Sequence, residues 1–169
     1  AGPPLLKAAT GEIATEEELG GAQMHATVSG LAEYLAENDG QAVQMCRELL
    51  HRLQWNKDCA VPRRRVYSEP LYDADELAGV IPCDYRNPYD MRELVARVVD
   101  GSDFMDFKPR YGAATVCIQA DIVGLPCGII GNNGPIDPAG ATKATQFLQL
   151  CDQANIPVVF MQNTTGYIV

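Results

Sequence analysis

The chain has 169 residues, enough for one domain with a substantial core or for parts of two. Hydrophobic residues make up 47% of it and charged residues 21%, a globular composition that excludes a disordered or fibrous chain. Lys and Arg number 13 against 22 Asp and Glu, and the net charge of −9 disfavours binding to nucleic acid or to anionic membranes. No apolar stretch approaches the roughly 20 residues that span a bilayer. From the charge and the apolar stretches together, we expect neither nucleic acid nor a membrane as a partner.

Two helices are predicted in the first third of the chain. Thr15 and Glu18 have the spacing of a capping box, which starts a short helix. A longer helix is predicted to begin at Asn38 or Asp39. Its apolar residues recur at intervals of three and four, which predicts that one side packs on a core. These residues are Ala42, Val43, Cys46, Leu49, Leu50 and Leu53.

The middle of the chain loses this periodicity. The segment Trp55–Pro88 contains four prolines and predicts a long connector between two lobes. Three adjacent arginines within it, Arg63–Arg65, either contact the phosphates of a ligand or form a solvated loop. Pro88 then predicts a helix over Tyr89–Val99, which Gly101 ends.

The last third alternates strands with a helix. The segments Ala114–Val123 and Cys127–Gly131, separated by Gly124–Pro126, predict a β-hairpin. A helix over about Ala139–Asn155 and an apolar strand over Val158–Met161 then predict a βαβ unit on a buried sheet, which places the chain in the α/β class. The helix residues expected to face inward are Ala141, Ala144, Phe147, Leu148 and Cys151.

The two ends of the sequence suggest a piece of a longer protein. The first residues, Ala1–Pro4, contain neither a helix cap nor a strand. The last residues follow a strand and a Gly-containing turn, where the next helix of an α/β fold is expected. We therefore expect a fragment of a larger α/β protein.

The cysteines predict reduced thiols. They form no CxxC pair, and neither histidine stands at metal-ligand spacing from them, so no metal site is expected. A catalytic Cys–His pair is the weaker alternative. The cysteines are Cys46 and Cys151 in predicted helices, Cys117 and Cys127 in predicted strands, and Cys59 and Cys83 in the connector.

Two turns are candidates for chemistry. Gly131–Pro135 follows a strand and either exposes backbone N–H groups to an anionic oxygen or is only a tight turn that needs positive φ. Gln162–Tyr167 follows the last strand, at the edge where open α/β sheets bind ligands. Neither turn has Walker or GxGxxG spacing, and no catalytic triad or carboxylate pair accompanies them. Catalysis here would therefore rely on backbone amides and cofactor chemistry.

A set of segments in a fixed order covers nearly the whole chain. They are Ala1–Glu12, Glu18–Ala22, Ser29–Gly30, Asn87–Arg92, Val99–Phe104, Phe107–Gly112, Gly128–Gly134, Phe147–Asp152 and Ile156–Gly166. Together they resemble the carboxyltransferase (β) subunits of biotin-dependent acyl-CoA carboxylases. The two candidate turns resemble the methylcrotonoyl-CoA and geranyl-CoA branch of that family more than its propionyl-CoA and acetyl-CoA branch.

The resemblance implies a crotonase-like (ClpP/crotonase) ββα-spiral fold with parts of two lobes. Residues 1–56 would end the N-terminal lobe on the acyl-CoA side. Residues 57–109 would form a connector with helices, and residues 110–169 would start the C-terminal lobe on the biotin side. The family's oxyanion donors would lie outside this sequence, so no catalytic residue is assigned and the isolated chain is expected to be inactive.

The resemblance also implies two sets of binding residues. Those on the carboxybiotin side are Gly131, Asn132, Asn133, Gly134, Thr165, Gly166 and Tyr167. Those near the acyl-CoA are Gly2, Pro3 and Pro4.

The implied reaction transfers CO2 from carboxybiotin to the γ carbon of a branched 2-enoyl-CoA, either 3-methylcrotonoyl-CoA or geranyl-CoA. The segment Pro135–Pro138 departs from the usual methylcrotonoyl-type sequence and slightly favours geranyl-CoA. The alternatives are a propionyl-CoA or acetyl-CoA type carboxyltransferase, a non-catalytic scaffold subunit, and a crotonase-family hydratase or isomerase that would need glutamates absent from the Gly131–Gly134 region.

The implied partner is an α subunit that carries biotin and uses ATP, bicarbonate and Mg²⁺. The coenzyme A thioester is the other substrate. The implied assembly is a homo-oligomer, a dimer or a trimer of dimers. The bacterial cytoplasm and the mitochondrial matrix both suit reduced thiols.

Overall fold

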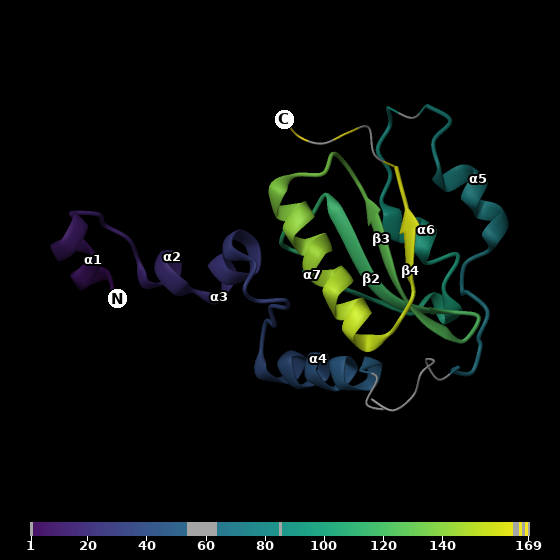
Figure 1. The fold of residues 1–169 in the computed structure, drawn as a ribbon, viewed down its shortest axis with the longest axis horizontal. Coiled ribbons are helices and arrows are strands. Elements are labelled where there is room, and N and C mark those ends of the chain that lie inside the picture. Colours follow the sequence, from purple (N-terminus) through teal and green to yellow (C-terminus); the bar gives the residue numbers. More distant parts are fainter. Residues whose placement is uncertain (1, 54–63, 85, 164–165, 167, 169) are drawn as a thin grey trace.

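A computed structural model describes residues 2–53, 64–84, 86–163, 166 and 168. Its N-terminal part is helical, and a mixed sheet follows (Figure 1). The helical elements before the sheet are α1 (Pro3–Thr10), α2 (Glu16–Gly20), α3 (Ala22–Met24), the π-helical turn η1 (His25–Ser29), α4 (Asp39–Arg52), η2 (Ala74–Glu76), α5 (Leu77–Val80), α6 (Met91–Val95) and η3 (Asp100–Ser102). The sheet region contains β1 (Phe104–Asp106), β2 (Thr115–Ile122), β3 (Leu125–Asn132), α7 (Pro138–Ala154) and β4 (Val158–Met161).

The four strands lie in the order β1-β2-β3-β4. β2 pairs antiparallel with both β1 and β3, and β3 pairs parallel with β4. The register of β2 and β3 runs from Thr115 opposite Asn132 to Ile122 opposite Leu125. This arrangement confirms the predicted hairpin and the predicted βαβ unit of β3, α7 and β4, because parallel neighbours need a crossover connection.

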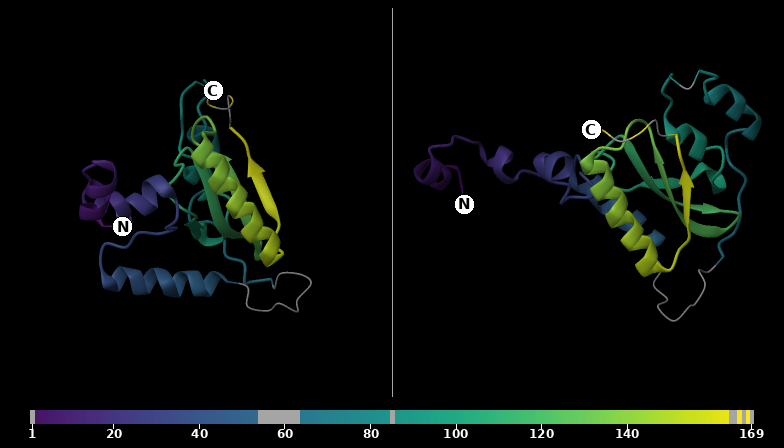
Figure 2. Two further views of the ribbon diagram at one scale, coloured as in Figure 1. Left: turned by 60° about the vertical axis from the view of Figure 1, so that its left-hand side comes forward. Right: turned by 45° about the horizontal axis from the view of Figure 1, so that its top comes forward.

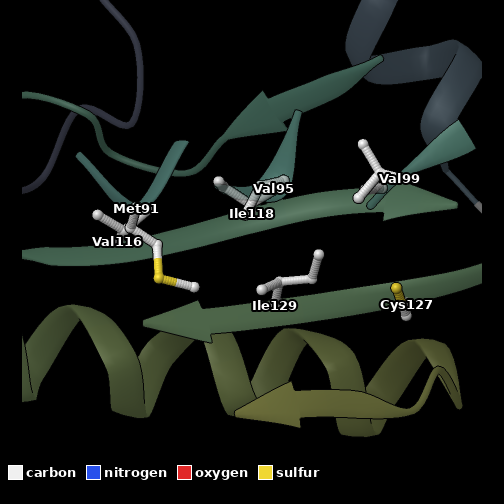
Figure 3. Close-up of a cluster of buried hydrophobic side chains, with 8 residues drawn as sticks. Met91, Val95, Val99, Val116, Ile118, Cys127 and Ile129 are labelled. Carbon is white, nitrogen blue, oxygen red and sulfur yellow. The ribbon is translucent and has the colours of Figure 1, made fainter. Parts of the chain in front are cut away.

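Each face of the sheet has its own buried cluster. On the α6 face, Met91, Val95 and Val99 pack on β2 and β3 (Figure 3). The strand residues of this cluster are Val116, Ile118, Ala120, Cys127 and Ile129. On the α7 face the cluster consists of Phe107, Cys117, Ile130, Phe147 and Cys151. The alternation of side chains along β2, with Val116 and Ile118 on one face and Cys117 on the other, separates the two clusters.

The predicted inward face of α7 is partly wrong. Phe147 and Cys151 are buried as expected, and Ala144 is half-buried, but Ala141 and Leu148 are exposed. Gly140 and Lys143 are buried instead. A Cβ at Gly140 would lie 2.2 Å from Thr115 Oγ1, so the first turn of α7 approaches β2 more closely than any other residue would permit.

The start of α6 also differs from the prediction. The helix covers Met91–Val95 rather than Tyr89–Val99, because the Asp90 side chain accepts a hydrogen bond from the Arg92 N–H (3.0 Å) and caps it. Turns and η3 continue the chain to Gly101, which has the left-handed φ of 60°. Burial of Met91, Val95 and Val99 follows the predicted periodicity.

The hairpin turns at Val123-Gly124 and not at the predicted Gly124–Pro126. Both residues have positive φ, 51° and 74°, as a two-residue hairpin turn requires. The Asp100 carboxylate, 8% exposed, accepts hydrogen bonds from the Val123 and Gly124 N–H groups at 2.7 and 2.6 Å. Two charge-assisted hydrogen bonds therefore hold the turn from the α6 side.

The arginine cluster braces this same turn. Arg64 Nε donates to the Val123 carbonyl (3.1 Å), and the Arg65 N–H donates to the Gly124 carbonyl (2.6 Å). The Arg65 guanidinium pairs with Asp121 at 3.2 Å. Arg63 lies outside the described residues. Arg64 is exposed in a loop, as one of the two expectations has it, and Arg64 and Arg65 both have protein partners among the described residues.

The apolar face of α4 is less covered than predicted. The helix has the predicted N-cap, with the Gln41 N–H donating to Asn38 Oδ1 at 2.9 Å. No residue of α4 is buried, and Val43 and Leu50 are 59% and 52% exposed. The reason is the position of α4 beside the sheet rather than on either of its faces (Figure 1). The predicted capping box of Thr15 and Glu18 is confirmed.

The N-terminal arm, residues 2–30, extends away from the sheet in all three views (Figures 1 and 2). It is anchored near Gly30, whose carbonyl accepts a hydrogen bond from the buried Lys108 Nζ. A Cβ at Gly30 would lie 2.8 Å from the Tyr111 ring, so only glycine permits this contact. The segment Phe107–Gly112 is therefore the junction between the arm and the sheet.

The predicted division into 1–56, 57–109 and 110–169 stays a prediction. Within the described residues, β1 and α6 come from the range 57–109, and both pack with the sheet of the range 110–169.

Replacing Val123 by Asn tests the hairpin turn. A β-branched residue is strained at φ 51°, and Asn tolerates this region, so Val123→Asn is expected to raise the free energy of unfolding by about 1 kcal/mol. Urea unfolding of the chain measures it. Val66→Asn, at a 94% exposed residue without positive φ, is the control and should change little. A loss of stability in Val123→Asn would contradict the assigned turn.

Candidate functional site

The first candidate turn, here called the 131–134 turn, consists of Gly131, Asn132, Asn133 and Gly134, and it begins inside the sheet. Gly131 and Asn132 are the last residues of β3, opposite Val116 and Thr115 of β2. None of the four residues has positive φ, so the alternative of a tight turn that needs positive φ is wrong. The backbone dihedral angles with which the chain leaves the sheet therefore do not themselves require glycine.

The Asn132 side chain joins the two candidate turns. Its Nδ2 donates to the carbonyl oxygens of Gly134 (2.9 Å) and Asn163 (2.7 Å). Its Oδ1 accepts a hydrogen bond from the Asn163 N–H (3.0 Å). Asn132 is 4% exposed, so this amide is a structural link between the ends of β3 and β4.

The Asn133 side chain points to the other face of the sheet. Its Oδ1 accepts a hydrogen bond from the Met91 N–H (2.7 Å), and its Nδ2 donates to Asp90 Oδ1 (2.9 Å). The Asn133 N–H donates to the Ala114 carbonyl (2.8 Å). Asn133 thereby fastens the turn to the start of α6.

Gly131 is required by close packing. A Cβ there would lie 2.4 Å from Met91 Sδ and 2.8 Å from the Met161 carbonyl oxygen. The backbone of Met161 cannot move without disturbing β4, so a larger residue would separate the strands. Gly131 is thus a packing residue beneath the turn.

The second turn, Gln162–Tyr167, lies beside the first. The Ile136 N–H donates to the Gly166 carbonyl (3.3 Å), and the Ile168 N–H donates to the Ile136 carbonyl (3.0 Å). A Cβ added at Gly166 would have no atom of the described residues within 4 Å.

The structure brings together five residues of the predicted biotin-side set, Gly131 to Gly134 and Gly166. Thr165 and Tyr167 lie outside the described residues. Gly2, Pro3 and Pro4 form the cap and first turn of α1, at the end of the arm far from the sheet (Figure 1). The structure does not bring this predicted acyl-CoA set near the two turns.

The chemical character of the joined turns is neutral and amide-rich. In the part of the chain that the structure describes, the Gly134 N–H has no hydrogen-bond partner. The carboxylate that contacts Asn133, Asp90, is engaged by Arg92 as well. The turns can therefore present a backbone donor to a polar oxygen, but they offer no side chain for general acid or base catalysis.

Electrostatics around Asp90 favour its ionised form. Burial alone would raise the pKa of Asp90, but hydrogen bonds from the Arg92 N–H and the Asn133 amide and the charge of Arg92 outweigh it and lower the pKa. Burial likewise opposes the charge of Arg92, but its partner Asp106 outweighs this effect and raises the pKa of Arg92. Both groups stay charged at neutral pH.

Lys143 is a buried charge that the sequence pattern did not reveal. Its side chain is completely buried in α7, and Nζ has no hydrogen-bond partner among the described residues. Burial lowers the pKa of Lys143. A single Lys between apolar helix positions is indistinguishable from an exposed one in the sequence, because only the close approach at Gly140 rotates it inward.

The cysteines behave largely as predicted. Cys117, Cys127 and Cys151 are buried, and burial raises their pKa values to about 12, 11 and 11, so they are protonated and unreactive. Cys46 is exposed, contrary to the expectation of a core position, because α4 leaves its apolar face uncovered. Cys59 lies outside the described residues.

A cavity of about 360 Å³ lies at the opposite end of the sheet, between α4, the start of β3 and the end of α7. Its lining is mainly apolar, with Tyr34 and Arg52 among its polar groups. Burial, helped by the charge of Glu33, raises the pKa of Tyr34 to about 12. None of the predicted site residues lines this cavity.

Two absences within the described ranges limit the kind of site. No cluster of three His, Cys, Asp or Glu side chains in them could hold a metal ion. No helix in those ranges is both long enough and apolar enough to cross a membrane.

The sheet, its crossing helix and the two joined turns define a crotonase-like fold of the carboxyl transferase type. The chain belongs to the carboxyl transferase domain family, whose model matches residues 1–169. Its backbone superposes on transcarboxylase 12S with a TM-score of 0.91 at 31% identity, over 100% of this chain and 34% of that one. That structure is a hexamer with methylmalonyl-coenzyme A bound.

Two relatives are more similar in sequence. The β subunit of Pseudomonas aeruginosa geranyl-CoA carboxylase is 54% identical over 100% of this chain and 31% of its own, with a TM-score of 0.60. The mitochondrial methylcrotonoyl-CoA carboxylase beta chain of Dictyostelium discoideum is 45% identical over 99% of this chain and 28% of that protein. The chain thus spans about a third of the length of the curated relatives it matches.

Gly131→Ala tests the packing beneath the turn. The added methyl group would overlap Met91 and the Met161 backbone, so the free energy of unfolding is expected to fall by about 1–3 kcal/mol. Gly134→Ala is the matched control, since its Cβ would lie 3.7 Å from Ala114 Cβ, an ordinary contact. Urea unfolding of both variants decides the point, and equal stabilities would argue against the assigned packing.

Lys143→Met tests the buried charge and its pH dependence. The unfolded chain keeps the Lys143 proton up to about pH 10.5, whereas the folded chain releases it at lower pH, so wild-type stability rises with pH between these two values. At pH 7 the Met variant should be more stable by about 1–3 kcal/mol, an advantage that shrinks as the pH approaches 10.5. Lys7→Met, at an exposed residue, is the control. A variant less stable than wild type at every pH would mean that Lys143 has a stabilising partner.

Proposed function

We propose that the chain is part of a carboxyltransferase β subunit that transfers CO2 from carboxybiotin to the γ carbon of a branched 2-enoyl-CoA, 3-methylcrotonoyl-CoA or geranyl-CoA. The observation that carries this proposal is the identity of 54% and 45% to a geranyl-CoA and a methylcrotonoyl-CoA carboxylase β subunit. The methylmalonyl-CoA-bound transcarboxylase is only 31% identical, although its backbone superposes well. The sequence therefore favours the enoyl-CoA branch.

The joined turns fit the biotin side of such a site. The ureido oxygen accepts hydrogen bonds, and the Gly134 N–H is a backbone donor that has no partner among the described residues. Carboxybiotin, when bound, supplies the carboxyl group that is transferred. The role proposed for this chain is to hold that group with backbone donors at the edge of the sheet, without contributing an acid or base.

The segment Pro135–Pro138 leads from the 131–134 turn into α7 and caps that helix. Asp137 caps α7 by accepting a hydrogen bond from the Gly140 N–H (2.5 Å), and Pro138 occupies the first helical position. These are residues that a helix start prefers. The departure of this segment from the usual methylcrotonoyl-type sequence is still the reason for slightly favouring geranyl-CoA.

The acyl-CoA side and the partners are proposed on the same basis. Gly2, Pro3 and Pro4 lie at the far end of the arm and would contact an acyl-CoA bound on the side of the N-terminal lobe. A biotin-carrying α subunit would use ATP, bicarbonate and Mg²⁺, and a homo-oligomer is proposed from the hexameric transcarboxylase 12S. The bacterial cytoplasm and the mitochondrial matrix both stay predictions.

Labelled bicarbonate tests the function. The full-length subunit, mixed with its biotin-carrying partner, ATP and Mg²⁺, should fix ¹⁴C into 3-methylcrotonoyl-CoA or geranyl-CoA. We expect kcat/KM for one of these to exceed that for propionyl-CoA and acetyl-CoA by at least about tenfold, since an apolar pocket distinguishes acyl chains by roughly this factor per carbon group.

The controls for this assay are the mixture without the partner subunit and the isolated 169-residue chain, and neither should fix carbonate. Preference for propionyl-CoA or acetyl-CoA would contradict the enoyl-CoA assignment. No fixation with any acyl-CoA would favour the scaffold alternative.

A further inference from the structure

A chain of polar contacts connects the 131–134 turn with β1 by way of Asp90 and Arg92 at the start of α6. It starts at Asn133, whose amide oxygen accepts the Met91 N–H (2.7 Å) and whose amide nitrogen donates to Asp90 Oδ1 (2.9 Å). The same Asp90 oxygen accepts hydrogen bonds from the Arg92 N–H (3.0 Å) and from Arg92 NH1 (3.1 Å). Arg92 Nε then donates to Asp106 Oδ2 of β1 at 2.6 Å.

The Arg92–Asp106 ion pair is partly protected from water. The two side chains are 25% and 19% exposed, whereas Asp90 is 49% exposed. A charge-assisted hydrogen bond in this setting is less screened than one at the surface, so Arg92 is held firmly by the sheet. Asp90, the more exposed member, is in turn held by Arg92.

The geometry of the turn depends on this arrangement. Gly131 packs against Met91, with no room for a Cβ. Asn133 is hydrogen-bonded to the backbone N–H of Met91 and to the side chain of Asp90. Both contacts are made on the α6 face of β3. Because a strand alternates its faces, Asn132 is directed away from α6 and binds Asn163 instead. The position of the turn is therefore set by α6 from one side and by the second turn from the other.

We propose that Asp90 and Arg92 are positioning residues for the biotin-side turn, with Asp106 as their anchor. They lie outside the biotin-side residues that the family resemblance implies, and neither is proposed to touch the substrate. The inference rests on the proposed function. Their effect passes through Asn133 to the Gly134 N–H, whose aim depends on where the turn sits.

The test separates the two substrates of the complete enzyme. In the carboxylation assay, the concentrations of biotin-carrying partner and of acyl-CoA are varied independently. Arg92→Met should raise the KM for the biotin carrier, or lower kcat at saturating carrier, by about tenfold or more, because small misplacement of reacting groups is costly. The KM for acyl-CoA should change less than about twofold, since that substrate is proposed to bind a different lobe.

Arg97→Met is the matched control. Arg97 follows the same helix and also makes two ion pairs, with Glu76 (2.8 Å) and Glu93 (2.9 Å), and its side chain is 10% exposed. Neither Glu76 nor Glu93 has a hydrogen bond or ion pair with the described residues of the 131–134 turn. A structural loss from deleting a paired arginine should appear equally in both variants, whereas the change in the carrier KM or in kcat should appear only in Arg92→Met.

A reciprocal exchange covers the case in which Arg92→Met does not fold. Asn133→Asp places a carboxylate against Asp90 and should lower the reaction with the carrier. Adding Asp90→Asn restores a donor and an acceptor in exchanged positions and should recover at least about half of the lost activity.

The outcomes are distinct. If wild type fixes carbonate but Arg92→Met equals Arg97→Met, or both KM values rise equally, or the exchange gives no recovery, the positioning role is wrong. If wild type itself fixes no carbonate, the proposed function fails. The positioning role is then tested by hydrogen exchange of the peptide containing residues 131–134, and it is contradicted if this peptide is equally protected in Arg92→Met and in Arg97→Met.

Discussion

The buried amide of Asn132 is the interaction on which the candidate site depends. Its three hydrogen bonds, to the Gly134 carbonyl and to both backbone groups of Asn163, join two turns that are 31 residues apart in the chain. Parallel strands end at the same edge of a sheet, but nothing in strand pairing fixes the loops beyond that edge. A buried amide that meets partners with both of its ends fixes them, because breaking it would leave desolvated polar groups without partners.

The other constraints in the molecule support this edge. Asp100, Arg64 and Arg65 hold the hairpin turn, which sets the register of β2 against β3. The close approach of Gly140 to Thr115 seats α7 on the sheet, and α7 determines where β4 begins. Gly131, finally, lets Met91 and β4 come together beneath the turn. Each contact uses a small or polar residue where a larger apolar one would shift a strand.

Local signals in the sequence predicted much of the fold. The capping box at Thr15, the N-cap at Asn38, the hairpin and the βαβ unit are confirmed, because caps and residue alternation act over a few residues. The errors arise where tertiary contacts compete. Asp90 rather than Pro88 sets the start of α6, and Gly140 rotates the buried face of α7 to include Lys143. The apolar face of α4 was expected to be covered, but only contacts outside the helix could decide that.

The site shows the same division. The two turns could be found from the sequence, since glycines and asparagines after buried strands mark them. The directions of the Asn132 and Asn133 amides could not, because an asparagine in a turn can face a ligand or its own scaffold with equal ease. Asp90 and Arg92 carried no signal of a role at the turn, as their connection to it exists only in the folded chain.

Hydrogen exchange of the full-length subunit is the most direct test of the claim that the joined turns face biotin. The exchange rates are compared with the biotinylated carrier domain and with the same domain lacking biotin. We predict biotin-dependent protection in peptides covering residues 131–136 and 162–168, with none in residues 2–10 of the arm. Protection confined to the arm or to the cavity beside α4, with no change at the two turns, would contradict it.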